Sequence, residues 1–135
     1  MTTYVKRQVQ IQVSESQNGA NLIFKRGDSP IKFDADDNLA EAEYKKYVLT
    51  LPVTDKDLLD GTTITAGRIL QIETDTELTV KLDDTGDTGI VVKPVSSDDS
   101  ETKRGVLYLE GNFTHVYITI AGTGEANVLM GAVGS

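Results

Sequence analysis

The sequence predicts an all-β protein, an antiparallel β-sandwich or jelly roll with at most one short helix. Two observations predict this class: short runs rich in Val, Ile, Leu, Tyr and Thr recur along the chain, and turn-forming residues separate them. Regularly spaced strands without strong helical patterns are typical of sandwiches, jelly rolls and barrels. In the second half the expected strands are Arg68–Thr74, Glu77–Leu82, Ile90–Val95, Gly105–Glu110, Phe113–Ala121 and Asn127–Val133.

The first half is expected to add further strands. Tyr4–Val13 alternates apolar and polar residues, which indicates a strand with one solvated side. Leu22–Phe24 and Ile31–Phe33 are short strands on either side of a turn. Tyr47–Val53 is another strand, and Pro52 lacks the N–H that a central ladder uses, so this strand is expected at a sheet edge.

Two places have features of a short helix. Asp34–Glu43 could hold a single capped turn or be an acidic loop, and an apolar pair near Leu58 could form a turn in the polar connector Asp55–Gly61. No linker rich in Pro, Gly or Ser divides the 135 residues, and no internal repeat is present. The chain is therefore expected to form a single sandwich domain over residues 1–135.

The composition argues against several functions. The chain has no cysteine, which excludes a disulfide framework and a thiolate nucleophile. Its 13 basic and 21 acidic residues give a net charge of −8, which repels a phosphate backbone, so nucleic acid is not an expected partner. The N-terminus lacks a signal-peptide pattern, and no run approaches the roughly 20 apolar residues of a membrane span. We therefore expect a soluble protein with no membrane partner.

Metals and cofactors are not expected. His115 is the only histidine, so one chain cannot form a multi-histidine site. Asp55, Asp57 and Asp60 with Gly61 resemble a calcium loop, but no glutamate follows where a bidentate ligand is needed. These carboxylates are interpreted as a solvated connector.

Two short motifs suggest alternative functions. Asp84-Thr85-Gly86 and Asp87-Thr88-Gly89 contain the tripeptide of retroviral-type aspartic proteases, in which a dimer brings two carboxylates together. The flanking residues do not fit that family, and a hairpin turn is the simpler interpretation.

The second motif is Arg26-Gly27-Asp28, which matches the adhesive sequence that integrins read. A protruding turn would hold the guanidinium and the carboxylate apart for a receptor, so an extracellular binding module is one alternative. The other interpretation is a turn that precedes the next strand.

The last two strands suggest a subunit interface. In Phe113–Ala121 alternation places Phe113, His115 and Tyr117 on the face opposite Val116 and Ile118, and Asn127–Val133 is apolar on both faces. The second face could be covered by the loop around Leu39, by the connector 55–66, or by another subunit. The subunit interpretation predicts a homo-oligomer, a trimer ahead of a dimer. The interface residues are then Tyr108, Phe113, Tyr117 and Met130.

The second half resembles the small β-rich virion proteins of tailed bacteriophages, which decorate the head or lie in the neck and tail. The resemblance is carried by Asp60–Leu70, Gly105–Gly111, Val116–Ile120 and Asn127–Met130. It implies a non-catalytic structural protein without cofactors, most often symmetric, whose partners are other virion structural proteins. Such a protein joins the virion in the host cytoplasm. A head decoration (cement) protein is expected ahead of a neck or tail component.

Overall fold

The computed structural model describes residues 6–7, 11–14, 22–26, 31–32, 41–94 and 104–135. The chain divides into two compact units, Thr2–Asp37 and Asn38–Ser135, where the sequence predicted one domain over 1–135. Each unit is all-β in the described residues, so the predicted fold class is confirmed.

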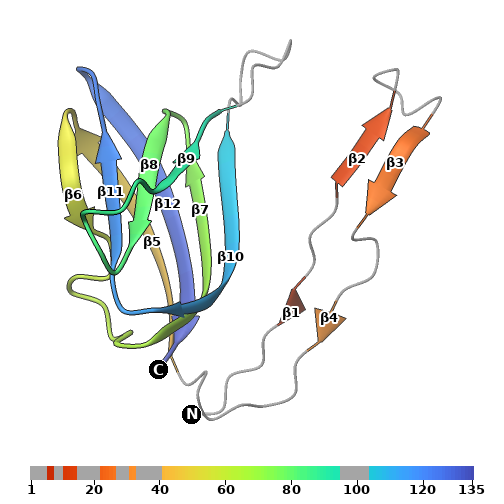
Figure 1. The fold of residues 1–135 in the computed structure, drawn as a ribbon, viewed down its shortest axis with the longest axis horizontal. Helices are drawn as coiled ribbons and strands as arrows, with labels where there is room; N and C mark the ends of the chain where they lie inside the picture. The colour runs from red at the N-terminus through yellow and green to blue at the C-terminus, as the bar shows by residue number, and fades with distance from the viewer. Residues whose placement is uncertain (1–5, 8–10, 15–21, 27–30, 33–40, 95–103) are drawn as a thin grey trace. The chain divides into compact units, whose positions relative to one another are not determined.

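The second unit is an antiparallel β-sandwich of two four-stranded sheets that lie face to face (Figure 1). The first sheet has the order β10-β7-β12-β5, and the second has the order β6-β11-β8-β9. The strands are β5 (Glu41–Thr50), β6 (Val53–Asp57), β7 (Gly67–Thr74), β8 (Leu78–Leu82), β9 (Ile90–Val92), β10 (Gly105–Phe113), β11 (Val116–Ile120) and β12 (Glu125–Gly134).

The core lies between the two sheets and follows the alternation of the strands. In β11 the side chains of Val116, Ile118 and Ile120 point inward and are at most 1% exposed. Leu70 and Ile72 of β7 meet them from the first sheet. Burial of these apolar side chains contributes on the order of 25 cal/mol per Å² and is the main force that holds the sheets together.

One predicted turn is wrong. Gly111-Asn112 was expected to end a strand, but β10 continues through it to Phe113, with a register shift after Glu110. The chain then turns at Thr114 and His115. Phe113 therefore belongs to β10, and its ring is buried opposite Gly67 in the core.

The strands β5 and β6 also differ from the prediction. β5 already begins at Glu41, so residues 41–43 are strand and not helix, whereas the rest of Asp34–Glu43 lies outside the described residues. Leu58 lies in a turn, and β6 covers Val53–Asp57, where a connector was expected. β5 pairs only with β12 among the described strands, so it lies at a sheet edge as expected, but it ends at Thr50 and Pro52 lies between β5 and β6.

The first unit contains two antiparallel strand pairs. β1 (Lys6–Arg7) pairs with β4 (Ile31–Lys32), and β2 (Ile11–Ser14) pairs with β3 (Leu22–Arg26). These pairs overlap the strands predicted from Tyr4–Val13, Leu22–Phe24 and Ile31–Phe33, but β2 continues to Ser14 and β3 continues to Arg26. The other residues of that prediction lie outside the described part of the chain.

Candidate functional site

The side of the first sheet that faces away from the core carries the largest exposed apolar side chains of β5. Tyr44 and Val48 are each 65% exposed, although both belong to a regular ten-residue strand. Val106 of β10 is 58% exposed on the same side. We call this surface the outer sheet face. Its residues are Tyr44, Lys46 and Val48 of β5, Leu129, Gly131 and Val133 of β12, Ile69, Gln71 and Glu73 of β7, and Val106, Tyr108 and Glu110 of β10.

The strand register sets the residues of the outer sheet face in rows. One row runs Tyr108, Gln71, Gly131 and Tyr44 across all four strands. Gly131 has no side chain, and a Cβ atom placed there would find only the Cβ of Gln71 within 4 Å, at 4.0 Å. No side chain therefore projects from the sheet at Gly131, and a tyrosine side chain lies at each end of the row.

Polar groups on this face are held by local contacts. Gln71 Nε2 donates to Glu73 Oε1 at 3.3 Å, and the Tyr108 hydroxyl donates to Glu110 Oε1. Each contact joins two polar side chains of the same strand. The apolar side chains of the outer sheet face lie between these polar pairs. Such a pattern of apolar centres with polar neighbours is typical of protein-contact surfaces.

An open groove continues this apolar surface at the other edge of the sandwich. It has a volume of about 550 Å³ and separates β9 from β10. Ile90 and Val91 line it from β9, at 42% and 59% exposure, and Val106 lines it from β10.

The expected interface of Tyr108, Phe113, Tyr117 and Met130 does not form one surface. Phe113 and Met130 are 2% and 0% exposed, because the single chain already encloses them between its sheets. These two side chains are therefore not available for a subunit contact, and this part of the prediction is wrong. Tyr108 lies on the outer sheet face, whereas Tyr117 alternates with Val116 and Ile118 on the outside of the other sheet.

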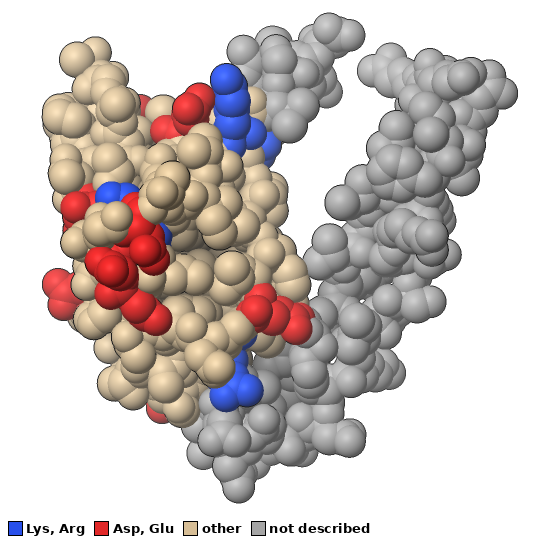
Figure 2. Space-filling model, viewed as in Figure 1, with Lys and Arg blue, Asp and Glu red and all other residues tan. Residues whose placement is uncertain are grey.

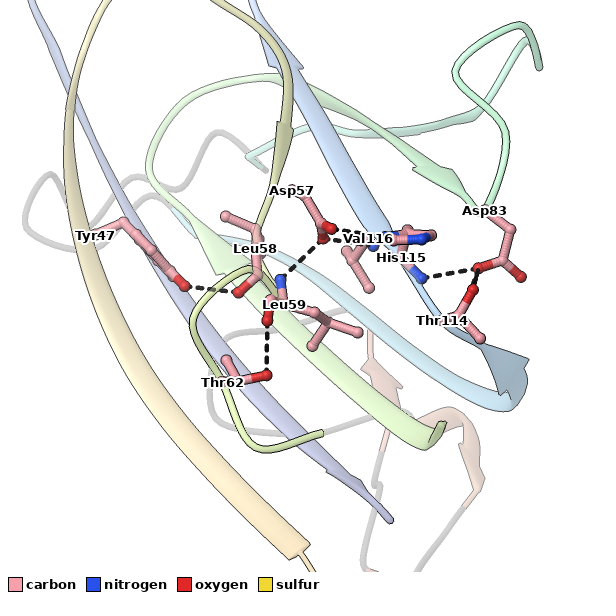
Figure 3. Close-up of polar contacts among 9 residues, drawn as sticks. All are labelled: Tyr47, Asp57, Leu58, Leu59, Thr62, Asp83, Thr114, His115 and Val116. Atoms are coloured by element: carbon pink, nitrogen blue, oxygen red, sulfur yellow. Dashed lines mark hydrogen bonds and ion pairs between the residues drawn. The ribbon is translucent and has the colours of Figure 1, made fainter. Parts of the chain in front are cut away.

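A polar network lies at the end of the sandwich where β6, β8 and β11 meet (Figure 3). Asp57 ends β6, and its Oδ1 accepts hydrogen bonds from the backbone N–H groups of Leu59 at 3.0 Å and Val116 at 3.1 Å. Its Oδ2 lies 2.7 Å from Nδ1 of His115. One carboxylate thus connects the turn after β6 to His115 and to Val116, the first residue of β11.

Asp83 directly follows β8, and its carboxylate also accepts hydrogen bonds from residues that precede β11. Its backbone has a positive φ of 64°, and its Oδ1 accepts hydrogen bonds from the N–H groups of Thr114 and His115 and from the Thr114 hydroxyl. Partial burial acts to raise the pKa of Asp83, but these hydrogen bonds and the charge of His115 outweigh it and lower the pKa below its ordinary value. The carboxylate is thereby held in its ionised form.

Tyr47 of β5 closes the network on the inner side. Its hydroxyl donates to the carbonyl oxygen of Leu58 at 2.8 Å, which fixes the turn against the sheet (Figure 3). Burial raises the pKa of Tyr47, and the nearby carboxylates of Asp57, Glu43 and Asp60 raise it further. The phenol therefore remains a donor.

His115 borders an open cavity of about 340 Å³, which makes it the first residue to consider for acid–base chemistry. Nδ1 of His115 is taken up by the contact with Asp57, so Nε2 is the ring nitrogen without a contact to Asp57. The three threonine hydroxyls that line the cavity, however, donate to oxygen atoms elsewhere: Thr62 to Leu59, Thr65 to Ser135 and Thr114 to Asp83. These three hydroxyl groups therefore hydrogen-bond within the surrounding turns, and none of them donates to His115. His115 also stacks on Tyr117, with ring centroids 5.5 Å apart.

Both Asp-Thr-Gly tripeptides lie in the exposed loop between β8 and β9, where acidic side chains gather on the face seen in Figure 2. Asp84 Oδ1 accepts a hydrogen bond from the N–H of Gly86 at 2.8 Å, and the Thr85 carbonyl accepts one from Lys81. The carboxylate of Asp84 thus stabilises its own turn, as the hairpin interpretation of Asp84 and Asp87 expects.

The carboxylates of the connector do not converge either. Asp55 Oδ1 pairs with Lys81 Nζ at 3.4 Å and accepts from Thr119, whereas Asp57 contacts His115. Within the described residues no group of three or more Asp, Glu or His side chains could hold a metal ion.

The remaining predicted site is the Arg26-Gly27-Asp28 motif. Arg26 is the last residue of β3, and Gly27 and Asp28 lie outside the described residues.

Sequence reasoning missed Tyr44 because it started this strand at Tyr47, and it did not single out Val48, which lies inside the predicted strand Tyr47–Val53. The alternation of Ala42, Tyr44, Lys46 and Val48 is visible in the sequence, but the acidic residues beside it favoured a loop. The described part of the chain contains no helix long and apolar enough to span a bilayer. Comparison with protein-family models, with curated proteins and with solved structures finds no match to this chain.

Proposed function

We propose that the chain is a non-catalytic structural protein of a tailed-bacteriophage virion, a head decoration (cement) protein in preference to a neck or tail component. It attaches to other virion structural proteins through the outer sheet face, in the host cytoplasm where the particle assembles. The observation that carries the proposal is the 65% exposure of Tyr44 and Val48 on a regular sheet face. Exposed apolar groups clustered in this way are typical of protein-contact sites.

The chemistry of the outer sheet face suits this role. Tyr44 and Tyr108 stand at the two ends of one row, and tyrosine is among the residues that contribute most to protein interfaces. Lys46, Glu73 and Glu110 provide charges between the apolar positions and can set the orientation of the partner. Each Å² of apolar surface that the contact buries contributes about 25 cal/mol, and many symmetric copies accumulate the effect on a particle.

The attachment can be tested with purified phage heads that were assembled without this chain. The parent protein should co-sediment with the heads, and Tyr44→Asp should weaken binding at least tenfold, because the contact would desolvate a carboxylate without a partner. Tyr117→Asp is the matched control, since Tyr117 lies on the outside of the other sheet, and it should bind like the parent. Equal loss with both variants would contradict the proposed face.

The genomic setting tests the broader proposal. Genes next to the one that encodes this chain should encode capsid, portal or tail proteins. Mass spectrometry of particles from the same source should then detect the chain. Particles without the chain, or neighbouring genes unrelated to a virion, would contradict the virion role.

A further inference from the structure

Among the strands that the structure describes, none pairs with the outer edge of β5. Within the described residues β5 pairs only with β12, and that ladder runs from Glu41 to Thr50 without a register shift. The strand contains no proline and no bulge, which are devices that protect exposed edges. A long regular edge of this kind is a template for a strand from another molecule.

The charges on β5 decide which strand fits. An inward-facing lysine such as Lys45 normally prevents edge pairing, because a neighbouring strand would desolvate it. Glu43, however, lies two residues earlier on the same face of the strand, so a second β5 could bring a carboxylate opposite each Lys45. Glu43 Oε1 accepts hydrogen bonds from Thr63, which leaves Oε2 for such a contact in the described structure.

Symmetry limits the registers that two β5 strands can adopt. A twofold axis perpendicular to the sheet makes the strands antiparallel, keeps both outer sheet faces on the same side and sets each residue opposite one of the same face. A register centred on Glu43 opposes two like charges, as do those centred on Lys45 and Lys46, and like charges directly opposite are destabilising. The register centred on Tyr44 instead sets Glu43 of each copy opposite Lys45 of the other.

We propose that two copies of the chain pair through β5 in the antiparallel register centred on Tyr44. The dimer has one continuous sheet of eight strands, four from each copy, with two Glu43–Lys45 pairs related by the axis. The Tyr44 side chains meet on the outer sheet face, where each is 65% exposed in the single chain. The dimer replaces the trimer that the sequence favoured. It does not rest on the virion role, because it needs only a second copy.

A cysteine placed on the axis tests the register. The chain has no cysteine of its own, so a single substitution reports one distance. Directly opposed residues have Cα atoms about 4.5–5.5 Å apart, within the range that a disulfide spans. Tyr44→Cys should therefore form a covalent dimer on mild oxidation. Val48→Cys, equally exposed in the parent, should not, because its two copies would lie about 26 Å apart. Equal cross-linking of both variants, or none with Tyr44→Cys, would overturn the proposal.

A charge exchange tests the pairs independently, with native mass measured by light scattering. The parent should have twice the mass of one chain. Glu43→Lys and Lys45→Glu should each weaken the dimer at least tenfold, because each opposes like charges. An equimolar mixture of these two variants should restore the dimer, since every pair is then of opposite sign. Lys46→Glu is the control for Lys45→Glu, because Lys46 faces Ala42 of the other copy in this register. A monomeric parent, or folded variants whose mixture stays monomeric, would overturn the proposal.

Discussion

The ring of Phe113 occupies the place where any side chain on Gly67 would have to lie. The two residues are register partners in β10 and β7, and a Cβ atom built on Gly67 would lie 2.0 Å from Phe113 Cε2. The ring is 2% exposed and is among the largest fully enclosed side chains of the described core. A glycine on one strand thus makes room for an aromatic ring on the next.

Gly67→Ala should therefore destabilise the protein by about 1–3 kcal/mol or more, because the ring or the backbone has to move in a closely packed core. Urea unfolding measures this change. Gly131→Ala is the matched control: its Cβ would be 4.0 Å from the nearest atom, and the change should be neutral or slightly stabilising. Equal stability of the two variants would contradict this account of Phe113.

The carboxylate of Asp57 should matter more than the histidine it contacts. Asp57→Ala leaves the N–H groups of Leu59 and Val116 without their acceptor, and we expect a loss of about 2 kcal/mol. Asp57→Asn keeps an acceptor oxygen and should lose less. His115→Gln should cost no more than about 1 kcal/mol, because the histidine side chain is half exposed. The free energies of unfolding of the three variants, measured in urea, check this order. The reverse order would show that the contact between Asp57 and His115, and not the backbone hydrogen bonds, holds the turn.

The sequence predicted the fold class and most strands of the sandwich, because the alternation of apolar and polar residues is a local signal. The edge position of β5 was also predicted, but from Pro52, which lies outside that strand. It failed at Phe113, because the pair Gly111-Asn112 carries a strong turn signal, whereas the burial of the ring against Gly67 depends on a residue far away in the sequence. Tertiary packing outweighed the local preference there, and β10 continued through the glycine.

The candidate site was harder to predict for a related reason. Met130 and Leu129 are both apolar, and the sequence alone cannot tell which face of a two-sided strand meets the core. The structure places Met130 inside, with 0% exposure, and Leu129 on the outer sheet face. Tyr44 was missed because its strand begins in an acidic stretch, Glu41–Glu43, that does not favour a strand by composition.

The hydrogen bonds of Asp83 predict a pH dependence. Its pKa in the folded chain is below the ordinary value of 3.8, so its contribution to stability is complete above that value and is lost as the pH falls through the folded pKa. Asp83→Asn, which tolerates the positive φ, should therefore flatten the fall in stability below pH 3.8. Unfolding midpoints between neutral and acid pH measure the slope. Asp87→Asn is the control for the loss of one carboxylate from the same exposed loop.

Thr74 provides the last prediction, because it is fully buried and yet polar. Its hydroxyl donates to the carbonyl oxygen of Thr76 at 2.6 Å and accepts from the Thr76 N–H at 3.1 Å, which closes the turn between β7 and β8. Thr74→Val has nearly the same shape, but it leaves both groups of Thr76 without a partner, and we expect a loss of about 1–3 kcal/mol. Thr74→Ser keeps the hydroxyl and removes one buried methyl group, which costs about 1 kcal/mol. Urea unfolding of both variants separates the two effects. Greater stability of Thr74→Val than of Thr74→Ser would mean that the methyl group, and not the hydroxyl, holds this turn against the core.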